Sequence, residues 1–348
     1  PEDAGCQRLI VERLLPLGFE AEWFYCGEVT NVLLTRGQGS PSFWFLGHTD
    51  VVPTGPEAAW ASPPFEPTIR NGRLYGRGAA DMKGGVAAMV VALERFVHAH
   101  PDHNGQLGLL LTSDEEGVAI DGVARVAERI GLRQAQPDYC LVGEPSSHEQ
   151  IGDVVRIGRR GSVNVELVVD GVQGHSAFPE KLDNPVHRLA PFLAALTSEA
   201  WDEGDAQFPP TSCQVSNIHA GTGAANVTPG QVSLRFNFRN GPVSPAEQLK
   251  RRVEALLERA DVSSCRLDWT VHARPFLPRP GRLRDAVVQI MQAQWQRSPE
   301  FNTGGGTSDA RFIAPLGTEV LELGLVNRSA HKVDENAAVE DLERLGRI

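Results

Sequence analysis

Short apolar runs that end in polar residues recur in the first part of the chain and again near its end. These runs cover residues 43–46, 106–112, 138–142 and 320–325. Runs of this kind are typical of strands that are buried on both faces of a parallel sheet. Helical spacing of apolar residues predicts intervening helices at residues 5–17, 82–98, 122–130 and 283–296. The alternation predicts an α/β fold with a mostly parallel twisted sheet flanked by helices.

The pattern changes in the middle of the chain. Residues 162–170 (SVNVELVVD) alternate strictly between apolar and polar, as expected for a strand with one exposed face. The following segments predict a helix at 185–196, strands at 211–219 and 231–240, a helix at 244–260 and a strand at 265–272. Ser244 and Pro245 fit the N-cap and first position of the second helix. The order βαββαβ predicts an inserted α+β ferredoxin-like domain.

We therefore expect two domains, because 348 residues exceed what one core usually serves. Residues 1–160 and 275–348 are expected to form one domain, and residues 161–274 the inserted one. The hydrophobic share of 41% and the charged share of 22% are typical of a globular protein. No apolar run reaches the length of a membrane span.

The net charge and the distribution of cysteines argue against several kinds of partner and site. A net charge of −11 disfavours nucleic acid and anionic membranes as partners. The five cysteines are dispersed without a CxxC pair, which disfavours a disulfide framework and a cysteine-ligated zinc site. This usage fits a reducing compartment, so we expect a cytoplasmic protein.

Histidines and carboxylates follow the predicted buried strands. His48 and Asp50 follow the first strand, Glu115 and Glu116 the second, and Glu144 the third. Asp81 at a loop-to-helix junction and His331 in a late loop offer two more such groups. Histidine and carboxylate without cysteine suit zinc, or a related ion such as manganese or cobalt. One ligand from each of these five segments would suit two ions if one carboxylate bridges them.

Some of these residues also have ordinary interpretations. Glu115 and Glu116 could pair a metal ligand with a general base, or could be two solvated acids in a loop. His175 lies in a loop of the inserted domain, where its surroundings alone favour a surface or structural role. Ser113 and Ser308 lack the GxSxG context of a serine hydrolase. The GRGAAD stretch lacks the GxGxxG pattern of a dinucleotide-binding loop.

Several motifs occur together in one order. They are GHTDVVP (47–53), GRGAADMKGG (76–85), TSDEEG (112–117) and VGEPSS (142–147), and later GHSAFPEKLDNPVH (174–187), RFNFR (235–239), TGGGTSDARFI (303–313) and HKVDE (331–335). In this order they resemble the di-zinc aminoacylase and carboxypeptidase superfamily, and within it the succinyl-diaminopimelate desuccinylase family. The resemblance covers nearly the whole chain, and that family's fold agrees with the two predicted domains.

The resemblance implies a role for each candidate residue of the metal site. It implies two zinc ions per subunit, for which cobalt or manganese can substitute. His48, Asp81 and Glu144 would hold one ion, and Asp81, Glu116 and His331 would hold the other. Glu115 would be the general base, and Asp50 would orient His48 through its other ring nitrogen. It also implies a cis peptide bond between Asp81 and Met82.

The resemblance further implies a homodimer formed through the inserted domain. In it, His175 would reach the partner's site and stabilise the oxyanion. The residues that match substrate contacts in the family are Arg160, Ser162, Asn226, Arg239, Thr307 and Ser308. The expected reaction is hydrolysis of N-succinyl-LL-2,6-diaminopimelate. The alternative is a sibling amidohydrolase, such as acetylornithine deacetylase, another N-acyl-amino-acid deacylase or a carboxypeptidase.

Overall fold

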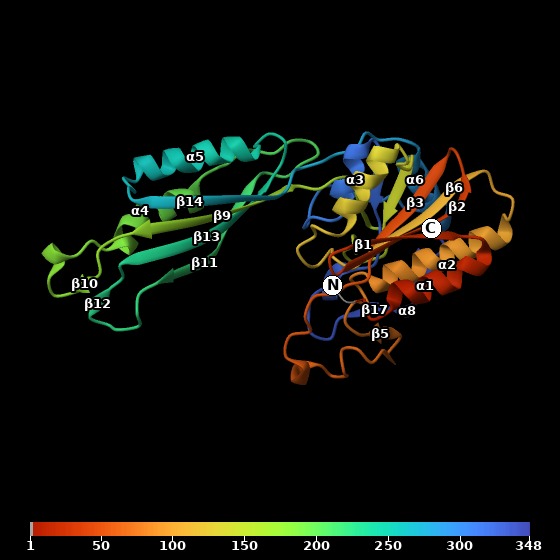
Figure 1. The fold of residues 1–348 in the computed structure, drawn as a ribbon, viewed down its shortest axis with the longest axis horizontal. Coiled ribbons are helices and arrows are strands. Elements are labelled where there is room, and N and C mark those ends of the chain that lie inside the picture. The colour runs from red at the N-terminus through yellow and green to blue at the C-terminus, as the bar shows by residue number, and fades with distance from the viewer. Residues whose placement is uncertain (1–2) are drawn as a thin grey trace. The chain divides into compact units, whose positions relative to one another are not determined.

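The computed structural model describes residues 3–348, which form two compact units (Figure 1). Unit 1 contains the described residues up to Gly158, together with Leu277–Asn302 and Ser308–Ile348. Unit 2 contains Arg159–Phe276 and the short loop Thr303–Thr307. In the part of the chain that the structure describes, no helix has the length and apolar character of a membrane span.

Unit 1 is built on an eight-stranded sheet. Its order is β1 (Glu20–Cys26), β2 (Val29–Gln38), β6 (Gly105–Thr112), β3 (Ser42–His48), β7 (Tyr139–Val142), β16 (Glu319–Glu322), β8 (Val154–Arg156) and β15 (Glu300–Asn302). The central neighbours β6, β3, β7 and β16 run parallel, whereas β1, β2 and β6 pair antiparallel. The predicted α/β class with a mostly parallel sheet is confirmed.

Helices cover both faces of this sheet. The helices α1 (Cys6–Leu14) and α2 (Lys83–Ala99) lie against one face, and α3 (Val123–Arg133) lies on the other (Figure 1). The remaining helices are α6 (Arg282–Trp295), α7 (Ala310–Ile313) and α8 (Val339–Leu345), with single 3₁₀ turns η1 (Leu15–Leu17), η2 (Glu57–Ala59), η4 (Ala314–Leu316) and η5 (Asn327–Ser329). The apolar sides of α1 and α2 pack on alternate residues of β2 and β6, such as Val32, Leu34, Leu109 and Leu111. Because helices cover both faces of the sheet, apolar residues occupy both sides of β6, and residues 106–112 therefore read as a continuous apolar run.

A small second sheet lies beside the large one in unit 1. It contains β4 (Thr68–Arg70), β5 (Arg73–Tyr75) and β17 (Asn336–Ala338), with β5 in the middle. The sequence did not indicate these three-residue strands, nor β8 and β15. They are too short to carry a periodic pattern, and β17 pairs with a strand about 260 residues earlier.

Unit 2 has the predicted order of principal elements. These are β9 (Gly161–Asp170), α4 (Pro185–Ser198), β11 (Ser212–Ala220), β13 (Gln231–Asn240), α5 (Ala246–Arg259) and β14 (Cys265–Ala273). The sheet order β11–β13–β9–β14 is antiparallel throughout and matches a split-βαβ sandwich. A short pair, β10 (Gly174–His175) and β12 (Val227–Thr228), and a 3₁₀ turn, η3 (Pro179–Lys181), complete the unit.

Two details of the sequence interpretation are wrong. Pro245 is extended and acts as the N-cap of α5, while the Ser244 hydroxyl donates to Asp202 instead of capping the helix. The loop 303–307 belongs to unit 2 rather than to the domain with the following helix. It joins unit 2 because the Thr303 hydroxyl donates to the main-chain oxygen of Gln207, at 2.6 Å.

Candidate metal centre

The large sheet brings three groups of polar side chains to one edge. His48 is the last residue of β3, Glu115 and Glu116 follow β6, and Glu144 follows β7. The three strands are neighbours and parallel, so their carboxyl ends open on the same edge. Motifs that are far apart in the sequence therefore lie close together in space.

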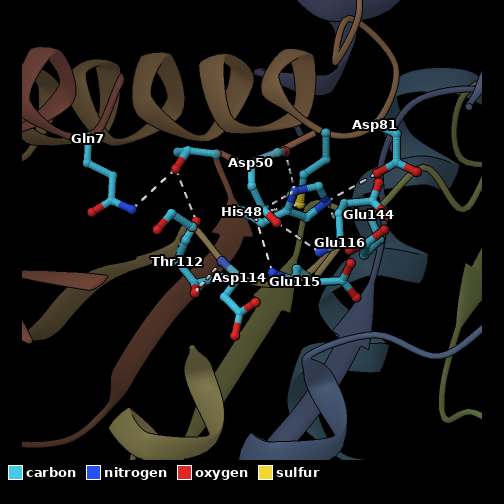
Figure 2. Close-up of polar contacts among 12 residues, drawn as sticks. Gln7, His48, Asp50, Asp81, Thr112, Asp114, Glu115, Glu116 and Glu144 are labelled. Atoms are coloured by element: carbon cyan, nitrogen blue, oxygen red, sulfur yellow. Dashed lines mark hydrogen bonds and ion pairs between the residues drawn. The ribbon is translucent and has the colours of Figure 1, made fainter. Parts of the chain in front are cut away.

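Two further candidate ligands come from loops. Asp81 precedes α2, and the Asp81–Met82 peptide bond is cis, which confirms that expectation. His331 lies between η5 and β17 and adopts a positive φ of 63°. Figure 2 shows the carboxylates of Asp81 and Glu144 on the side of the His48 ring that carries Nε2.

Glycine lets α2 approach the ends of these strands. A Cβ atom on Gly85 would lie 2.4 Å from the main-chain oxygen of Gly143, immediately before Glu144. Only a residue without a side chain tolerates so close an approach. The side chain of Met82, which is fully buried, fills the space beside this contact. The helix start therefore holds Asp81 close to Glu144.

The ligand atoms form two groups that share Asp81. In one group, His48 Nε2 lies 3.2 Å from Asp81 Oδ1 and 3.6 Å from Glu144 Oε1. In the other, His331 Nε2 lies 2.7 Å from Glu116 Oε1 and 3.2 Å from Asp81 Oδ2. Asp81 thus offers one oxygen to each group, which is the geometry that a bridging carboxylate requires.

The donor set fits divalent cations. In each group the potential ligand atoms all lie within 4.8 Å of one another. Imidazole nitrogen and carboxylate oxygen are ligands for zinc, manganese and cobalt. A third combination, His48 with Glu115 and Glu116, meets the same spacing. Distance alone therefore leaves Glu115 available as a ligand as well as a base.

The pKa shifts of the buried side chains also favour a bound cation. Burial raises the pKa of Glu144 well above its ordinary value, and the neighbouring Asp81 and Glu115 raise it further. Burial would lower the pKa of His48, but its hydrogen bond to Asp81 and the charge of Glu144 raise it overall. Without an ion, protons on the histidines offset the carboxylate charge. Divalent cations at the same place would remove the need for them.

Glu115 has the environment of a general acid–base group. Burial is the main reason why its pKa is raised to about 8, and Asp309 adds to this shift more than Glu116 does. A bound cation would lower this value, because it favours the ionised carboxylate. A carboxyl group that titrates near neutral pH can both accept and return a proton.

Asp50 holds the loop that carries Glu115 and Glu116. Its Oδ1 accepts the N–H of Glu115 at 3.3 Å, and its Oδ2 accepts that of Glu116 at 2.9 Å (Figure 2). The contact of Asp50 with His48 is made mainly by the main-chain oxygen of Asp50 rather than by its carboxylate. The main-chain oxygen of Asp50 lies 3.0 Å from His48 Nδ1, whereas the nearest carboxylate oxygen lies 3.6 Å away. The carboxylate is already engaged by two main-chain donors.

Three buried charged residues around the site had no role in the sequence interpretation. Glu335 and Arg77 form a buried ion pair next to Asp81. Asp309 is only 3% exposed, and neither of its carboxylate oxygens has a hydrogen-bond partner among the described residues. Burial raises the pKa of Asp309 to about 7. All three residues lie inside recognised motifs, but a motif does not reveal burial or partners.

The guanidinium groups expected to bind substrate belong to unit 2. Ser162 and Arg239 are paired across β9 and β13, and Arg160 directly precedes β9. Burial lowers the pKa of Arg160, and the nearby charges of Arg239 and Arg159 lower it further. Such a cluster of partly buried cations suits a carboxylate-bearing ligand.

His175 and Asn226 also lie together in unit 2. The pairing of β10 with β12 places His175 opposite Val227, and the main-chain oxygen of Asn226 accepts the N–H of Ser176 at 3.0 Å. The N–H of Ala177 donates to His175 Nδ1 at 3.1 Å, so the proton of the neutral ring is on Nε2. The exposed His175 can therefore donate a hydrogen bond from Nε2.

The last two predicted substrate contacts differ in exposure. Thr307 is half-buried in the loop 303–307. Ser308 is fully buried, and its hydroxyl donates to Glu322. To donate to a substrate carboxylate, the Ser308 hydroxyl would have to leave Glu322, although its oxygen can still accept a hydrogen bond.

Comparison with known proteins agrees with this architecture. The profile of Peptidase family M20/M25/M40 matches residues 44–348. A succinyl-diaminopimelate desuccinylase from Methylococcus capsulatus is 56% identical over 348 residues, which cover 100% of this chain and 92% of that protein. One from Halorhodospira halophila is 55% identical with the same coverage.

Solved structures show the same fold. An M20 family metallo-carboxypeptidase from Sulfolobus solfataricus aligns with a TM-score of 0.82 at 18% identity, covering 99% of this chain and 92% of that one. A dinuclear metal-binding peptidase of the M20 family from Bacillus subtilis aligns with a TM-score of 0.72 at 13% identity, covering 99% and 90%. The chain therefore belongs to peptidase family M20/M25/M40 and groups within it with the succinyl-diaminopimelate desuccinylases.

Proposed function

We propose that this protein hydrolyses N-succinyl-LL-2,6-diaminopimelate to succinate and LL-2,6-diaminopimelate, a step of lysine and cell-wall precursor synthesis. Relatives that carry this activity in their names are 53–56% identical over the whole chain. The observation that carries the chemistry is the shared carboxylate of Asp81 between two ligand groups, with Glu115 beside them. The dispersed free cysteines support a cytoplasmic location.

The site would hold two divalent cations, zinc in the first instance, with cobalt or manganese as substitutes. His48, Asp81 and Glu144 would bind one ion, and Asp81, Glu116 and His331 the other. Bound ions would supply Lewis-acid polarisation of the succinyl amide carbonyl and make a nearby water easier to deprotonate. The dinuclear metal site named for the Bacillus subtilis relative supports this stoichiometry.

Glu115 moves the proton in both halves of the reaction. Its carboxylate takes a proton from the attacking water as the water oxygen bonds to the amide carbon. When the carbon–nitrogen bond breaks, the same proton passes to the leaving nitrogen. The proton left on the new carboxyl group then passes to the released amine, so the products are succinate and the ammonium form of LL-2,6-diaminopimelate, and Glu115 is again ionised. The Asp50 carboxylate holds Glu115 in place for both transfers by accepting the main-chain N–H of Glu115.

The cations of unit 2 would recognise the carboxylates of the substrate. Arg160 and Arg239 are partly buried and close enough for the charge of one to lower the pKa of the other. A substrate with several carboxylates would relieve this repulsion and accept bidentate hydrogen bonds. Ser162, Asn226, Thr307 and Ser308 are proposed as further contacts of the substrate.

His175 would stabilise the oxyanion in a homodimer. Hydrogen bonding from Ala177 keeps the proton of the ring on Nε2, which an oxyanion donor needs. The inserted domain is the proposed dimerisation surface, so that His175 of each subunit serves the site of its partner.

The role of Glu115 is tested by the variant Glu115→Gln. Glutamine keeps the size of the side chain but cannot accept the proton from water. We expect two bound ions per subunit by elemental analysis and a kcat reduced by about 10²–10⁴-fold. Glu149→Gln is the control, because Glu149 is an exposed acid paired with Arg328, and it should keep full activity. Near-normal turnover by Glu115→Gln would refute the assignment.

The exchange of His175 between subunits is tested by mixing two inactive variants. Glu115→Gln and His175→Ala are dissociated, mixed in equal amounts and allowed to reassociate. In a hybrid dimer, one site would combine an intact Glu115 with an intact His175 from the other subunit. We expect recovery of about a quarter of wild-type activity. No recovery in a mixture that forms hybrid dimers would show that His175 does not act on the partner's site.

A further inference from the structure

A buried ion pair lies directly behind the proposed metal site. Arg77 Nη1 and Glu335 Oε2 are 2.6 Å apart, with Arg77 6% exposed and Glu335 fully buried. Removing two charges from water is costly unless other hydrogen bonds compensate. The further contacts of this pair are therefore informative about its role.

Glu335 holds the main chain at the bridging carboxylate. Its second oxygen, Oε1, accepts the N–H of Ala80 at 2.9 Å and the N–H of Asp81 at 3.0 Å. Its own main-chain oxygen accepts the N–H of Gly76 at 3.0 Å. Three hydrogen bonds thus connect Glu335 to the segment that ends in Asp81. Because Arg77 neutralises Glu335, these bonds are formed without adding net charge to a site rich in carboxylates.

Arg77 connects two more loops to the same point. Its Nη1 donates to the main-chain oxygen of Lys332 at 3.2 Å, and its Nη2 donates to that of Pro53 at 3.1 Å. Lys332 is the residue after His331. The pair therefore joins the segments that carry Asp81 and His331, two of the three ligands proposed for one ion.

The two proposed ions depend on this pair to different degrees. His48 and Glu144 lie at the ends of β3 and β7, where the eight-stranded sheet fixes them. Asp81 and His331 lie in loops, and the strand that follows His331, β17, pairs with the small sheet and not with the eight-stranded one. The ion shared by Asp81, Glu116 and His331 therefore relies more on Arg77 and Glu335.

We propose that Glu335, paired with Arg77, is a positioning residue that sets Asp81 and His331 for the ion they share with Glu116. The inference rests on the proposed two-ion site. Loss of the pair would weaken this ion in preference to the ion held by His48, Asp81 and Glu144. A pair that served only the stability of the fold would have no such preference.

The test is a calorimetric titration of chelator-stripped protein with zinc. Wild type should bind two ions with resolvable dissociation constants. Glu335→Gln removes the charge and keeps a hydrogen-bond acceptor, so it should weaken one ion by about 10–100-fold and leave the other within about threefold. Glu335→Ala removes both features and should weaken the same ion further. Cobalt spectra of the loaded variants identify which of the two environments is lost.

Two controls separate positioning from folding. Glu149→Gln disrupts the ion pair between Glu149 and Arg328, which lies three residues before His331. The side chain of Arg328 is 65% exposed and that of Glu149 is 74% exposed. It should leave both dissociation constants unchanged. Arg77→Lys keeps the buried positive charge and loses part of the network, so it should weaken the same ion less than Glu335→Ala does. If Glu335→Gln does not fold, as judged by circular dichroism, Arg77→Lys decides the question.

The outcomes of the proposal and of the proposed function can be told apart. Equal weakening of both ions, or unchanged binding with only a lower melting temperature, would overturn the positioning role. Wild type that binds a single ion would overturn it too. Wild type that binds two ions but does not cleave the succinyl amide would refute the proposed function and leave the positioning role intact.

Discussion

At the scale of single residues, the metal site concentrates ionisable groups, of which His48 and Glu144 are buried and His331 is exposed. Asp81, Glu116 and Glu144 converge with only two histidines to offset them. Burial would raise the pKa of Asp81, but hydrogen bonds from His331 and His48 keep it far below its usual range. The same contacts with Asp81 and Glu116 raise the pKa of His331 to about 10. In the metal-free protein, the protonation of each of these groups therefore depends on the charges of its neighbours.

This sharing predicts how the metal-free protein responds to pH. The pKa of Glu115 is raised from 4.5 to about 8 and that of Asp309 from 3.8 to about 7, so ionising either group disfavours the folded state. The raised pKa of His331 adds stability that is complete below its ordinary value of 6.5 and is lost as pH rises through about 10. All three shifts have the same sign, so the free energy of unfolding should fall between about pH 5 and pH 10.

Urea denaturation in the presence of a chelator measures this slope. The variant His331→Gln should flatten the upper part of the curve, from about pH 7 to pH 10. Protein loaded with zinc should show a weaker slope, because cations stabilise the ionised carboxylates. A stability that is constant or increases with pH in the stripped wild type would contradict this description of the site.

The ligand residues could be predicted from the sequence because each follows a buried strand or lies in a motif. His48, Glu116 and Glu144 needed only the rule that parallel strands end on one edge. Arg77 and Glu335 could not be found in this way, since their pairing joins positions 258 residues apart. The main-chain contact of Asp50 with His48 was also hidden, because a sequence pattern does not say which oxygen of a residue faces a ring.

At the scale of elements, the start of α2 determines how closely Asp81 approaches the sheet. Long apolar strands and amphipathic helices were predictable, because burial imposes a period on several residues in succession. Helix starts were harder to place. Ser244 has the side chain of an N-cap, yet Pro245 occupies that position and Ser244 donates to Asp202. The competing tertiary hydrogen bond, 42 residues away, decides the outcome.

Replacing Gly85 by alanine tests the close approach of α2. The new Cβ would meet the main-chain oxygen of Gly143 at 2.4 Å, so the helix would have to shift. We expect a loss of about 1–3 kcal/mol in the free energy of unfolding, together with weaker zinc binding. Gly131→Ala in α3 is the matched control. There the nearest atom is the end of the Leu316 side chain at 3.1 Å, and the gain in helix propensity should leave stability unchanged or raised.

Chemical denaturation of both alanine variants, with and without zinc, decides the matter. Equal stability of Gly85→Ala and wild type would show that α2 can move without cost. The sequence indicated a glycine pair after Asp81, but only the structure shows which main-chain atom requires it.

At the scale of the whole molecule, the chain divides its chemistry between two units. Unit 1 contains all five proposed metal ligands and Glu115. Unit 2 contains the clustered guanidinium groups and His175. The change from buried strands to strictly alternating ones indicated an insertion in the sequence. The return of loop 303–307 to unit 2 was not visible, because it depends on main-chain oxygens that accept bonds from Thr303 and Arg159.

The proposed two-ion desuccinylase can be tested on its own substrate. The decisive measurement is the rate of N-succinyl-LL-2,6-diaminopimelate hydrolysis by chelator-stripped protein as zinc is added in counted amounts. N-acetylornithine and a dipeptide serve as competing substrates. We predict no turnover without metal, a plateau at two ions per subunit, and a kcat/KM for the succinyl amide far above that for the other substrates. Turnover without metal, a plateau at one ion, or preference for the acetyl or peptide substrate would contradict it.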